Sequence, residues 1–170
     1  MRPLLYGASF LTVFIGYVGI AMAGDLPLSS KQNNVETFQL ACRDNPKITT
    51  IDMNNCIADK VDQIKAIQTR YEEAARNRVA SGLDDPASHD HAQKTLDAYD
   101  AESKAWDELR VKATDATYTD WEEGSIRNIM SAQREIEIRG LRIHDLWLNW
   151  LQYMDSTPSV LPEPKFIDVQ

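Results

Sequence analysis

Residues 41–71 read ACRDNPKITTIDMNNCIADKVDQIKAIQTRY, and the interpretation of the whole chain starts from this stretch. It contains both cysteines of the protein, Cys42 and Cys56. Cys56 lies about two turns into a helical pattern that begins near Thr50, whereas Cys42 precedes the helix-breaking residues Asp44-Asn45-Pro46. A bond between the two sulfurs would tie the segment before the helix onto the helix itself.

The first 23 residues have the layout of a secretory signal peptide. Arg2 precedes an apolar run over residues 4–20, and the small residues Ala21 and Ala23 follow at the positions of a cleavage site. We therefore expect cleavage after Ala23 and a soluble, periplasmic or secreted mature protein. An uncleaved membrane anchor is the alternative, because the run is close to a spanning length.

Export would place the two cysteines in an oxidising compartment, where disulfides form and persist. Two cysteines allow one intramolecular pairing, Cys42 with Cys56, and the short loop that it closes would contribute about 3 kcal/mol to stability. A zinc site is disfavoured, because the spacing is not that of a zinc knuckle and the sequence has no second cysteine pair. We predict one disulfide and no bound metal.

The chain is acidic, with 18 basic and 26 acidic residues and a net charge of −8. Removal of the leader with its Arg2 leaves 147 residues, enough for one domain, and changes the net charge to −9. An acidic balance argues against nucleic acid and anionic membrane surfaces as partners, since both attract cations. It is compatible with a cationic protein partner, although acidity also keeps an exported protein soluble.

Three stretches carry the three- and four-residue apolar spacing of amphipathic helices, at about 50–80, 86–113 and 126–153. Thr49 or Thr50 is expected to cap the first, Gly82 to end it in a left-handed conformation, and Ser125 to cap the third. Asp85 and Pro86 are expected to start the second helix. Two outward-facing ion pairs are expected, Glu72–Arg76 and Glu135–Arg139.

Residues 30–40 are expected to form a short additional helix, and no stretch reads as a convincing strand. The predicted fold is therefore all-α, an antiparallel bundle of three long helices plus a short N-terminal helix, with one disulfide. The helical domain is expected over residues 24–155. The proline-rich tail 156–170 is either disordered or lies over the bundle through Phe166, Ile167 and Val169.

The sequence offers no catalytic constellation. His89 and His91 are two residues apart at a helix start, so they face different directions and do not suggest a metal site. His144 is expected to be a half-buried packing residue. We find no strand-turn-helix nucleophile elbow, no glycine-rich phosphate loop and no cleft for paired carboxylates. We predict that the protein is not an enzyme and uses no cofactor.

The four-residue spacing of Trp106 and Arg110 would allow the guanidinium to lie over the indole, or to reach a carbonyl in the 119–125 loop. A core tryptophan beside a partly buried arginine is the alternative. Trp147 and Trp150 are expected to close the far end of the bundle.

Several short motifs follow one another in an order that resembles the LprI-like lysozyme-inhibitor family of small exported helical proteins. The resemblance covers residues 41–146, and the residues that carry it are Cys42, Asp52, Met53, Asn54, Cys56, Tyr71, Trp106, Arg110, Gly124, Ser125, Arg139 and Arg142. Members of that family usually carry a second cysteine pair. Here Thr114 occupies the first of those positions and no cysteine follows Cys56.

The resemblance implies that the protein binds and inhibits a lysozyme-type hydrolase. The segment Asp120-Trp121-Glu122-Glu123 is our candidate contact, because it combines an aromatic anchor with three carboxylates that would attract a cationic enzyme. A solvated loop whose Trp121 folds back into the core is the alternative. A periplasmic immunity or envelope-adaptor protein is a second hypothesis, and a helical hydrolase with a cleft of titratable groups is a third.

Overall fold

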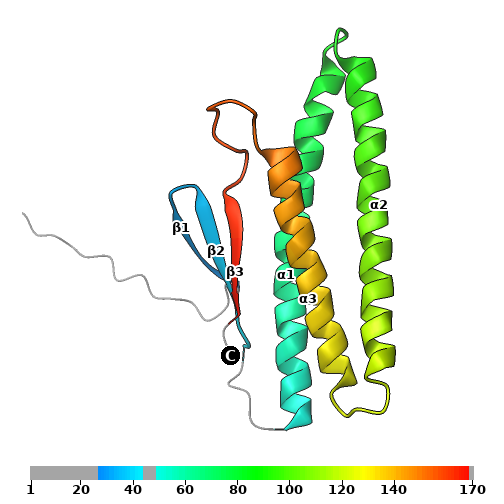
Figure 1. The fold of residues 1–170 in the computed structure, drawn as a ribbon. Helices are drawn as coiled ribbons and strands as arrows, with labels where there is room; N and C mark the ends of the chain where they lie inside the picture. Colours follow the sequence, from blue (N-terminus) through cyan, green and yellow to red (C-terminus); the bar gives the residue numbers. More distant parts are fainter. Residues whose placement is uncertain (1–26, 44–48, 169–170) are drawn as a thin grey trace, which may run out of the picture.

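Three long helices pack together beside a small three-stranded sheet (Figure 1). The computed structural model describes residues 27–43 and 49–168. The elements in chain order are β1 (Leu28–Gln32), β2 (Val35–Leu40), α1 (Thr50–Ala80), a 3-10 turn (Ser81–Asp84), α2 (His89–Asp120), α3 (Arg127–Leu146), a π-helical turn (Trp147–Leu151) and β3 (Glu163–Asp168). The expected leader 1–23, the breaker 44–46 and Val169 lie outside the described residues. Within those ranges, no helix is both long enough and apolar enough to cross a membrane.

The core forms where α1 packs against α3 and the sheet. α1 contributes Ile64, Ile67, Tyr71 and Ala75, which are at most 4% exposed, at the three- and four-residue steps that predicted the helix. Helix α3 packs against both α1 and α2, whereas the sheet covers α1 and α3 on the side away from α2 (Figure 1). The predicted start and end of the first helix are confirmed, and Thr49 caps it by accepting a hydrogen bond from the Asp52 amide at 3.2 Å.

The expected helix at residues 30–40 is wrong, because this segment forms an antiparallel hairpin of β1 and β2. Asn33 and Asn34 join the strands with φ angles of 49° and 61°, a two-residue turn that asparagine tolerates better than most residues. Every second residue of β2 is buried: Glu36, Phe38 and Leu40. This alternation was present in the sequence, but Val35 and Phe38 also lie at a three-residue step that fits a helix.

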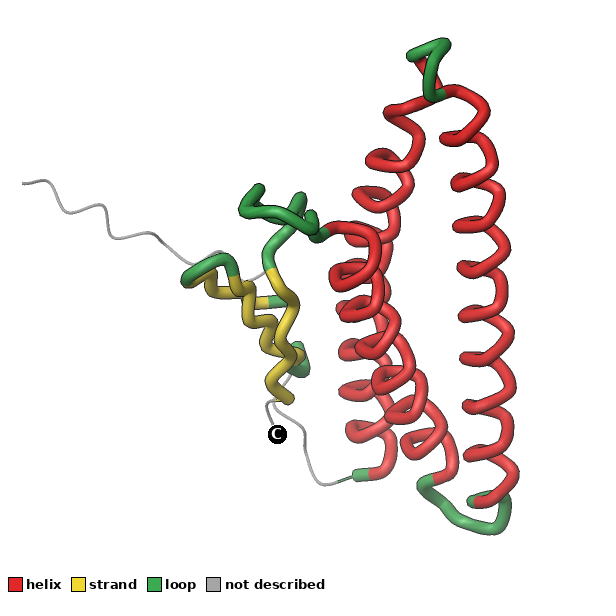
Figure 2. The backbone as a smooth tube through the Cα atoms, turned by 45° about the horizontal axis from the view of Figure 1, so that its top comes forward, coloured by secondary structure: helices red, strands yellow, loops and turns green. Residues whose placement is uncertain are grey.

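The tail forms a third strand, because β3 pairs in parallel with β2 and completes the sheet, and Figure 2 shows the three strands together. Phe38 of β2 and Phe166 of β3 stack with ring centroids 5.7 Å apart, and Phe166 packs against the hydrophobic core, as the alternative of a tail lying over the bundle expected. The strand itself was not expected, and the protein is therefore not purely all-α. Pairing between the two ends of the chain has no local signature in the sequence.

The disulfide between Cys42 and Cys56 is confirmed, with Cα atoms 4.7 Å apart. The amide of Gln63 strengthens the same junction, since it donates to the Ala41 carbonyl at 2.6 Å and accepts from the Ala41 amide at 3.1 Å. The segment after β2 is thus bound to α1 by the disulfide and by hydrogen bonds with Gln63 and Asp59, the latter from the Arg43 amide at 3.1 Å.

Several expected helix ends are also wrong. Gly82 has no positive φ, and the chain passes from α1 into the 3-10 turn without a left-handed cap. Asp85 and Pro86 precede α2, which begins at His89. Ser125 does not cap α3, because Ile126 is the residue before that helix.

Helix α2 continues to Asp120, through threonines that the sequence suggested would weaken it. Thr114, Thr117 and Thr119 each donate a hydroxyl hydrogen bond to the carbonyl four residues earlier. These bonds within the helix occupy the side chains that would otherwise compete with its backbone pairing.

A buried ion pair joins the sheet to α1. Glu36 is 2% exposed and accepts hydrogen bonds from Arg70 and, at 3.1 Å, from Ser29. Burial by itself would raise the pKa of Glu36, but Arg70, Ser29 and Lys31 together hold the pKa below its ordinary value of 4.5. The folded state therefore favours the carboxylate form.

We predict that Glu36→Gln changes the acid limb of the stability curve. Because the folded-state pKa of Glu36 lies below the unfolded one, its contribution is present above about pH 5 and is lost as the pH falls through the folded pKa. Urea unfolding should show the variant less stable than the wild type at pH 7, with the gap closing towards pH 3. Glu108→Gln, an exposed change on α2, is the control. A pH-independent gap would contradict the assignment.

Replacing both cysteines with serine should lower the free energy of unfolding by about 3 kcal/mol, because the unfolded chain gains the freedom of the opened loop. Chemical denaturation measures this loss, and reduced wild-type protein should give a similar value. An unchanged denaturation midpoint would show that Gln63 and the sheet suffice to hold this junction.

Candidate functional site

The residues singled out by the sequence fall into an interior group between the helices and an exposed group at the turn after α2. Among the described residues, no group of histidine, cysteine, aspartate and glutamate side chains could hold a metal ion. His89 lies 3.6 Å from Asp90 in an exposed pair, and His91 is exposed. His144 is exposed as well, and its ring lies 5.6 Å from that of Trp147.

The centre of the interior group is Arg142 of α3, whose side chain is 1% exposed. It donates hydrogen bonds to Glu102 and, at 3.0 Å, to Ser103 on α2, as well as to Asp145 on its own helix at 3.0 Å. A buried guanidinium is tolerated only when carboxylates and hydroxyls replace its water. Arg142 therefore requires α2 to lie beside α3 at this level.

Aromatic rings enclose the same guanidinium. Arg142 lies 5.5 Å from the ring centre of Trp106 and 5.9 Å from that of Tyr99. The sequence offered Arg110 as a cation over Trp106, or a core tryptophan beside a partly buried arginine. The cation over the indole is Arg142, while Arg110 is partly buried at 24% exposure, as the alternative expected. The sequence pointed to the four-residue neighbour on the same helix, whereas the cation comes from α3.

Trp150 extends this arrangement to the end of α3. Its indole N–H donates to Glu102 at 3.1 Å, and its ring meets Tyr99 edge-on with centroids 5.1 Å apart. Tyr99 donates its hydroxyl to the Glu72 carbonyl of α1 at 3.1 Å, and burial raises the pKa of Tyr99. Both Trp147 and Trp150 pack against the core.

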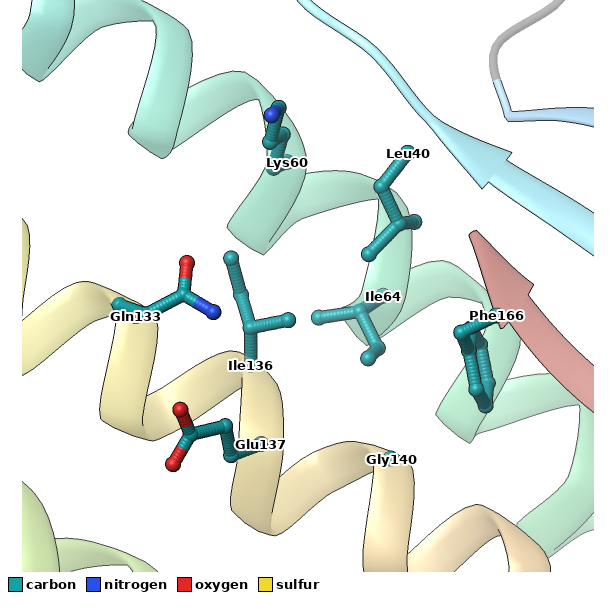
Figure 3. A pocket seen from close by; sticks show the side chains of 8 residues that line it. All are labelled: Leu40, Lys60, Ile64, Gln133, Ile136, Glu137, Gly140 and Phe166. Atoms are coloured by element: carbon teal, nitrogen blue, oxygen red, sulfur yellow. The ribbon is translucent and has the colours of Figure 1, made fainter. Parts of the chain in front are cut away.

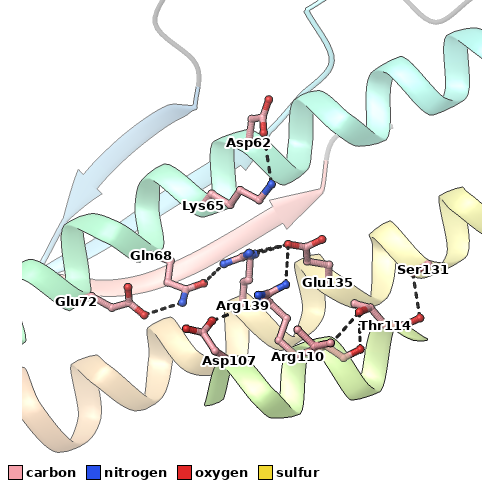
Figure 4. Close-up of polar contacts among 11 residues, drawn as sticks. Asp62, Lys65, Gln68, Glu72, Asp107, Arg110, Thr114, Ser131, Glu135 and Arg139 are labelled. Atoms are coloured by element: carbon pink, nitrogen blue, oxygen red, sulfur yellow. Dashed lines mark hydrogen bonds and ion pairs between the residues drawn. The ribbon is translucent and has the colours of Figure 1, made fainter. Parts of the chain in front are cut away.

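A second polar layer lies where the three helices meet (Figure 4). Arg139 donates to the Glu135 carboxylate at 2.6 and 2.9 Å and to the side-chain amide oxygen of Gln68 at 2.7 Å. The Arg110 guanidinium lies 3.6 Å from the Glu135 carboxylate. The Glu135–Arg139 pair is confirmed, but it does not face outward, because the Arg139 side chain is only 11% exposed. The cavity beside this layer measures about 10 Å³, which is too small for a substrate.

The other expected pair, Glu72–Arg76, does not form. Arg76 pairs with Asp100 of α2, and Glu72 accepts a hydrogen bond from Gln68 at 2.7 Å. The Arg76–Asp100 pair ties α1 to α2, whereas the Gln68–Glu72 bond lies within α1.

The remaining motif residues of α1 stabilise its first turn and hold the segment before β3. Asp52 and Asn54 form hydrogen bonds within the first turn of α1, and Met53 is partly exposed there. Tyr71 is fully buried and donates its hydroxyl to the Pro162 carbonyl at 2.7 Å, which fastens the approach to β3. Burial raises the pKa of Tyr71 to about 12. Of these side chains, Asn54 lines a hollow of about 280 Å³ between α1 and α3.

The exposed group is the acidic turn, which we define as Asp120, Trp121, Glu122 and Glu123. All four residues are exposed, and Trp121 retains 38% of its surface. Trp121 therefore does not fold back into the core. Its neighbour Tyr118 is also exposed, at 39%, and lies 5.4 Å from the guanidinium of Arg127.

Hydrogen bonds to two of its backbone carbonyls hold the acidic turn in one conformation. The Gly124 amide donates to the Trp121 carbonyl at 2.8 Å, and Arg127 donates to the Glu122 carbonyl at 2.7 Å. A Cβ atom at position 124 would lie 3.1 Å from the Trp121 carbonyl oxygen, so glycine allows this close approach. Arg127 thus makes the contact with the turn that the sequence suggested for Arg110.

Comparisons with protein-family models, curated proteins and solved structures find no match for this chain. The resemblance to LprI-like inhibitors rests on the motif residues alone. Their positions separate a buried framework, centred on Arg142, from an exposed turn with four adjacent polar and aromatic side chains.

We predict that Glu102→Gln lowers the free energy of unfolding by about 1–3 kcal/mol, because it leaves the buried Arg142 with too few acceptors. Adding Arg142→Met should recover part of this loss, since removal of both partners leaves no unpaired charge. Denaturant unfolding of Glu102→Gln, Arg142→Met and the double variant measures the coupling. Glu108→Gln on the same helix is the control. Additive effects of the two changes would contradict a direct buried pair.

Proposed function

We propose that this chain is an exported binding protein that inhibits a lysozyme-type peptidoglycan hydrolase, not an enzyme in its own right. The observation that carries the proposal is the acidic turn, where Trp121 stands exposed among three exposed carboxylates at the junction of α2 and α3. A large aromatic side chain surrounded by charges of one sign is suited to protein recognition.

The scaffold behind the turn supports this role. Near the turn, Ser131 of α3 donates to the Thr114 carbonyl of α2 at 3.1 Å, and Arg110 pairs with Glu135 across the same two helices. A contact segment held in one conformation loses little conformational entropy on binding. The turn can therefore present Trp121 without first having to be ordered.

Charge favours a cationic partner. Asp120, Glu122 and Glu123 add to a chain whose net charge is −8, so the turn would attract a basic enzyme surface and accelerate the encounter. Such attraction between exposed charges weakens as salt shortens the screening length, from about 10 Å at 0.1 M to about 3 Å at 1 M. Salt dependence is thus a direct test of the mechanism.

The experiment is a turbidity assay of a cationic lysozyme with purified chain 24–170. Replacing Asp120 with Asn and Glu122 and Glu123 with Gln should raise the inhibition constant about tenfold at low salt, equivalent to about 1.4 kcal/mol. The difference should shrink at high salt. Trp121→Ala should weaken inhibition at both salt concentrations, because its contribution is apolar.

The matched control removes one aspartate and two glutamates elsewhere on the surface, through Asp84→Asn, Glu73→Gln and Glu108→Gln. This variant has the same net charge as the first but keeps the acidic turn. Equal effects of the two triple variants would mean that net charge alone acts. An unchanged constant for the turn variant would remove the turn from the mechanism, and no inhibition by the wild type would refute the proposed function.

A further inference from the structure

An apolar pocket lies between the sheet and the helices, on a different part of the molecule from the acidic turn. Its volume is about 220 Å³. Leu40 of β2, Ile64 of α1, Ile136 of α3 and Phe166 of β3 converge on it (Figure 3). Four separate elements thus supply the walls, and none of the proposed contacts with a hydrolase involves them.

The pocket remains open because α3 carries a glycine where it faces the sheet. A Cβ atom at Gly140 would lie 3.9 Å from both Ile64 Cδ1 and Phe166 Cδ2, at ordinary contact distance, so a longer side chain would extend into the space. Leu40 and Ile64 are 2% and 1% exposed, so the surrounding fold holds these walls in place. The disulfide adjoining β2 fixes the Leu40 wall against α1.

The dimensions suit a short apolar group. A cavity of roughly 150 Å³ lined by leucine, isoleucine and phenylalanine stays dry and binds benzene. This pocket is larger, and its apolar wall has the same kind of side chains, so an alkyl chain of roughly six carbons fits it. Each methylene that the pocket removes from water should tighten binding about fourfold.

The polar residues of the pocket indicate the head group. Gln133 can both donate and accept hydrogen bonds, and Figure 3 shows its amide on the opposite side of the pocket from Phe166. Glu137 and Lys60 also line the pocket and carry opposite charges. Each of these charges would attract one ionic head group and repel the other, so neither ion gains a clear advantage, whereas the neutral Gln133 amide can both donate to and accept from a hydroxyl. We propose that this pocket binds the alkyl chain of a small neutral amphiphile with a hydroxyl head.

The test uses 1-hexanol as the probe and methyl NMR of the whole mature chain as the readout. Addition of 1-hexanol should shift the δ1 methyl signals of Ile64 and Ile136 saturably. It should leave that of Ile51, which is 72% exposed, unchanged. Hexanoate and hexylammonium should each bind more weakly. Tighter binding of either ion would overturn the assignment of a neutral head, and no saturable shift of Ile64 and Ile136 would overturn the site.

Gly140→Leu fills the pocket and should weaken 1-hexanol binding at least tenfold, equivalent to about 1.4 kcal/mol. His144→Leu, an exposed change on the same helix, should leave binding unchanged. If circular dichroism shows that Gly140→Leu is unfolded, Ile136→Phe fills the pocket instead. Wild-type affinity in a folded, filled variant would refute the proposal. Lysozyme inhibition measured on the same variants is independent of this outcome.

Discussion

The burial of the Arg142 guanidinium is the constraint on which the arrangement of the three helices depends. Helix α2 has only two buried residues, Ala92 and Tyr99, although it is 32 residues long. So little full burial leaves the position of α2 weakly defined by apolar contacts alone. Arg142 adds a positional requirement, because its charge must be satisfied and its partners Glu102 and Ser103 lie on α2.

A buried charge of this kind specifies position more sharply than apolar contact does. An apolar stripe tolerates small shifts of one helix along another, whereas Arg142 is satisfied only when two α2 side chains arrive together. The partly buried Arg110–Glu135 pair repeats the principle between α2 and α3, whereas Arg76–Asp100 is an exposed pair between α1 and α2. The role of polar contacts in setting helix register is a hypothesis for this bundle, and the coupling between Glu102 and Arg142 measures it.

The sheet acts on the opposite side of α1 and joins the two ends of the described chain. Phe38 and Phe166 cover the α1–α3 interface, while the disulfide at Cys42 and the Glu36–Arg70 pair attach β2 to α1. This covering layer also creates the apolar pocket, because the strands approach α3 where Gly140 has no side chain. The acidic turn and the pocket are therefore products of different layers, and the two proposed contacts use separate parts of the fold.

The sequence by itself determined the span of α1, its Thr49 cap and the disulfide, because each depends on residues close together in the chain. It also identified the acidic turn, since exposed charges need no partner to be recognised. Only the tertiary structure decided that residues 28–40 are strands, because β2 becomes stable by pairing with β3 from the far end of the chain. The same holds for Arg142 over Trp106: which cation meets which ring depends on how two helices pack, and helical spacing carries no information about a residue on another helix.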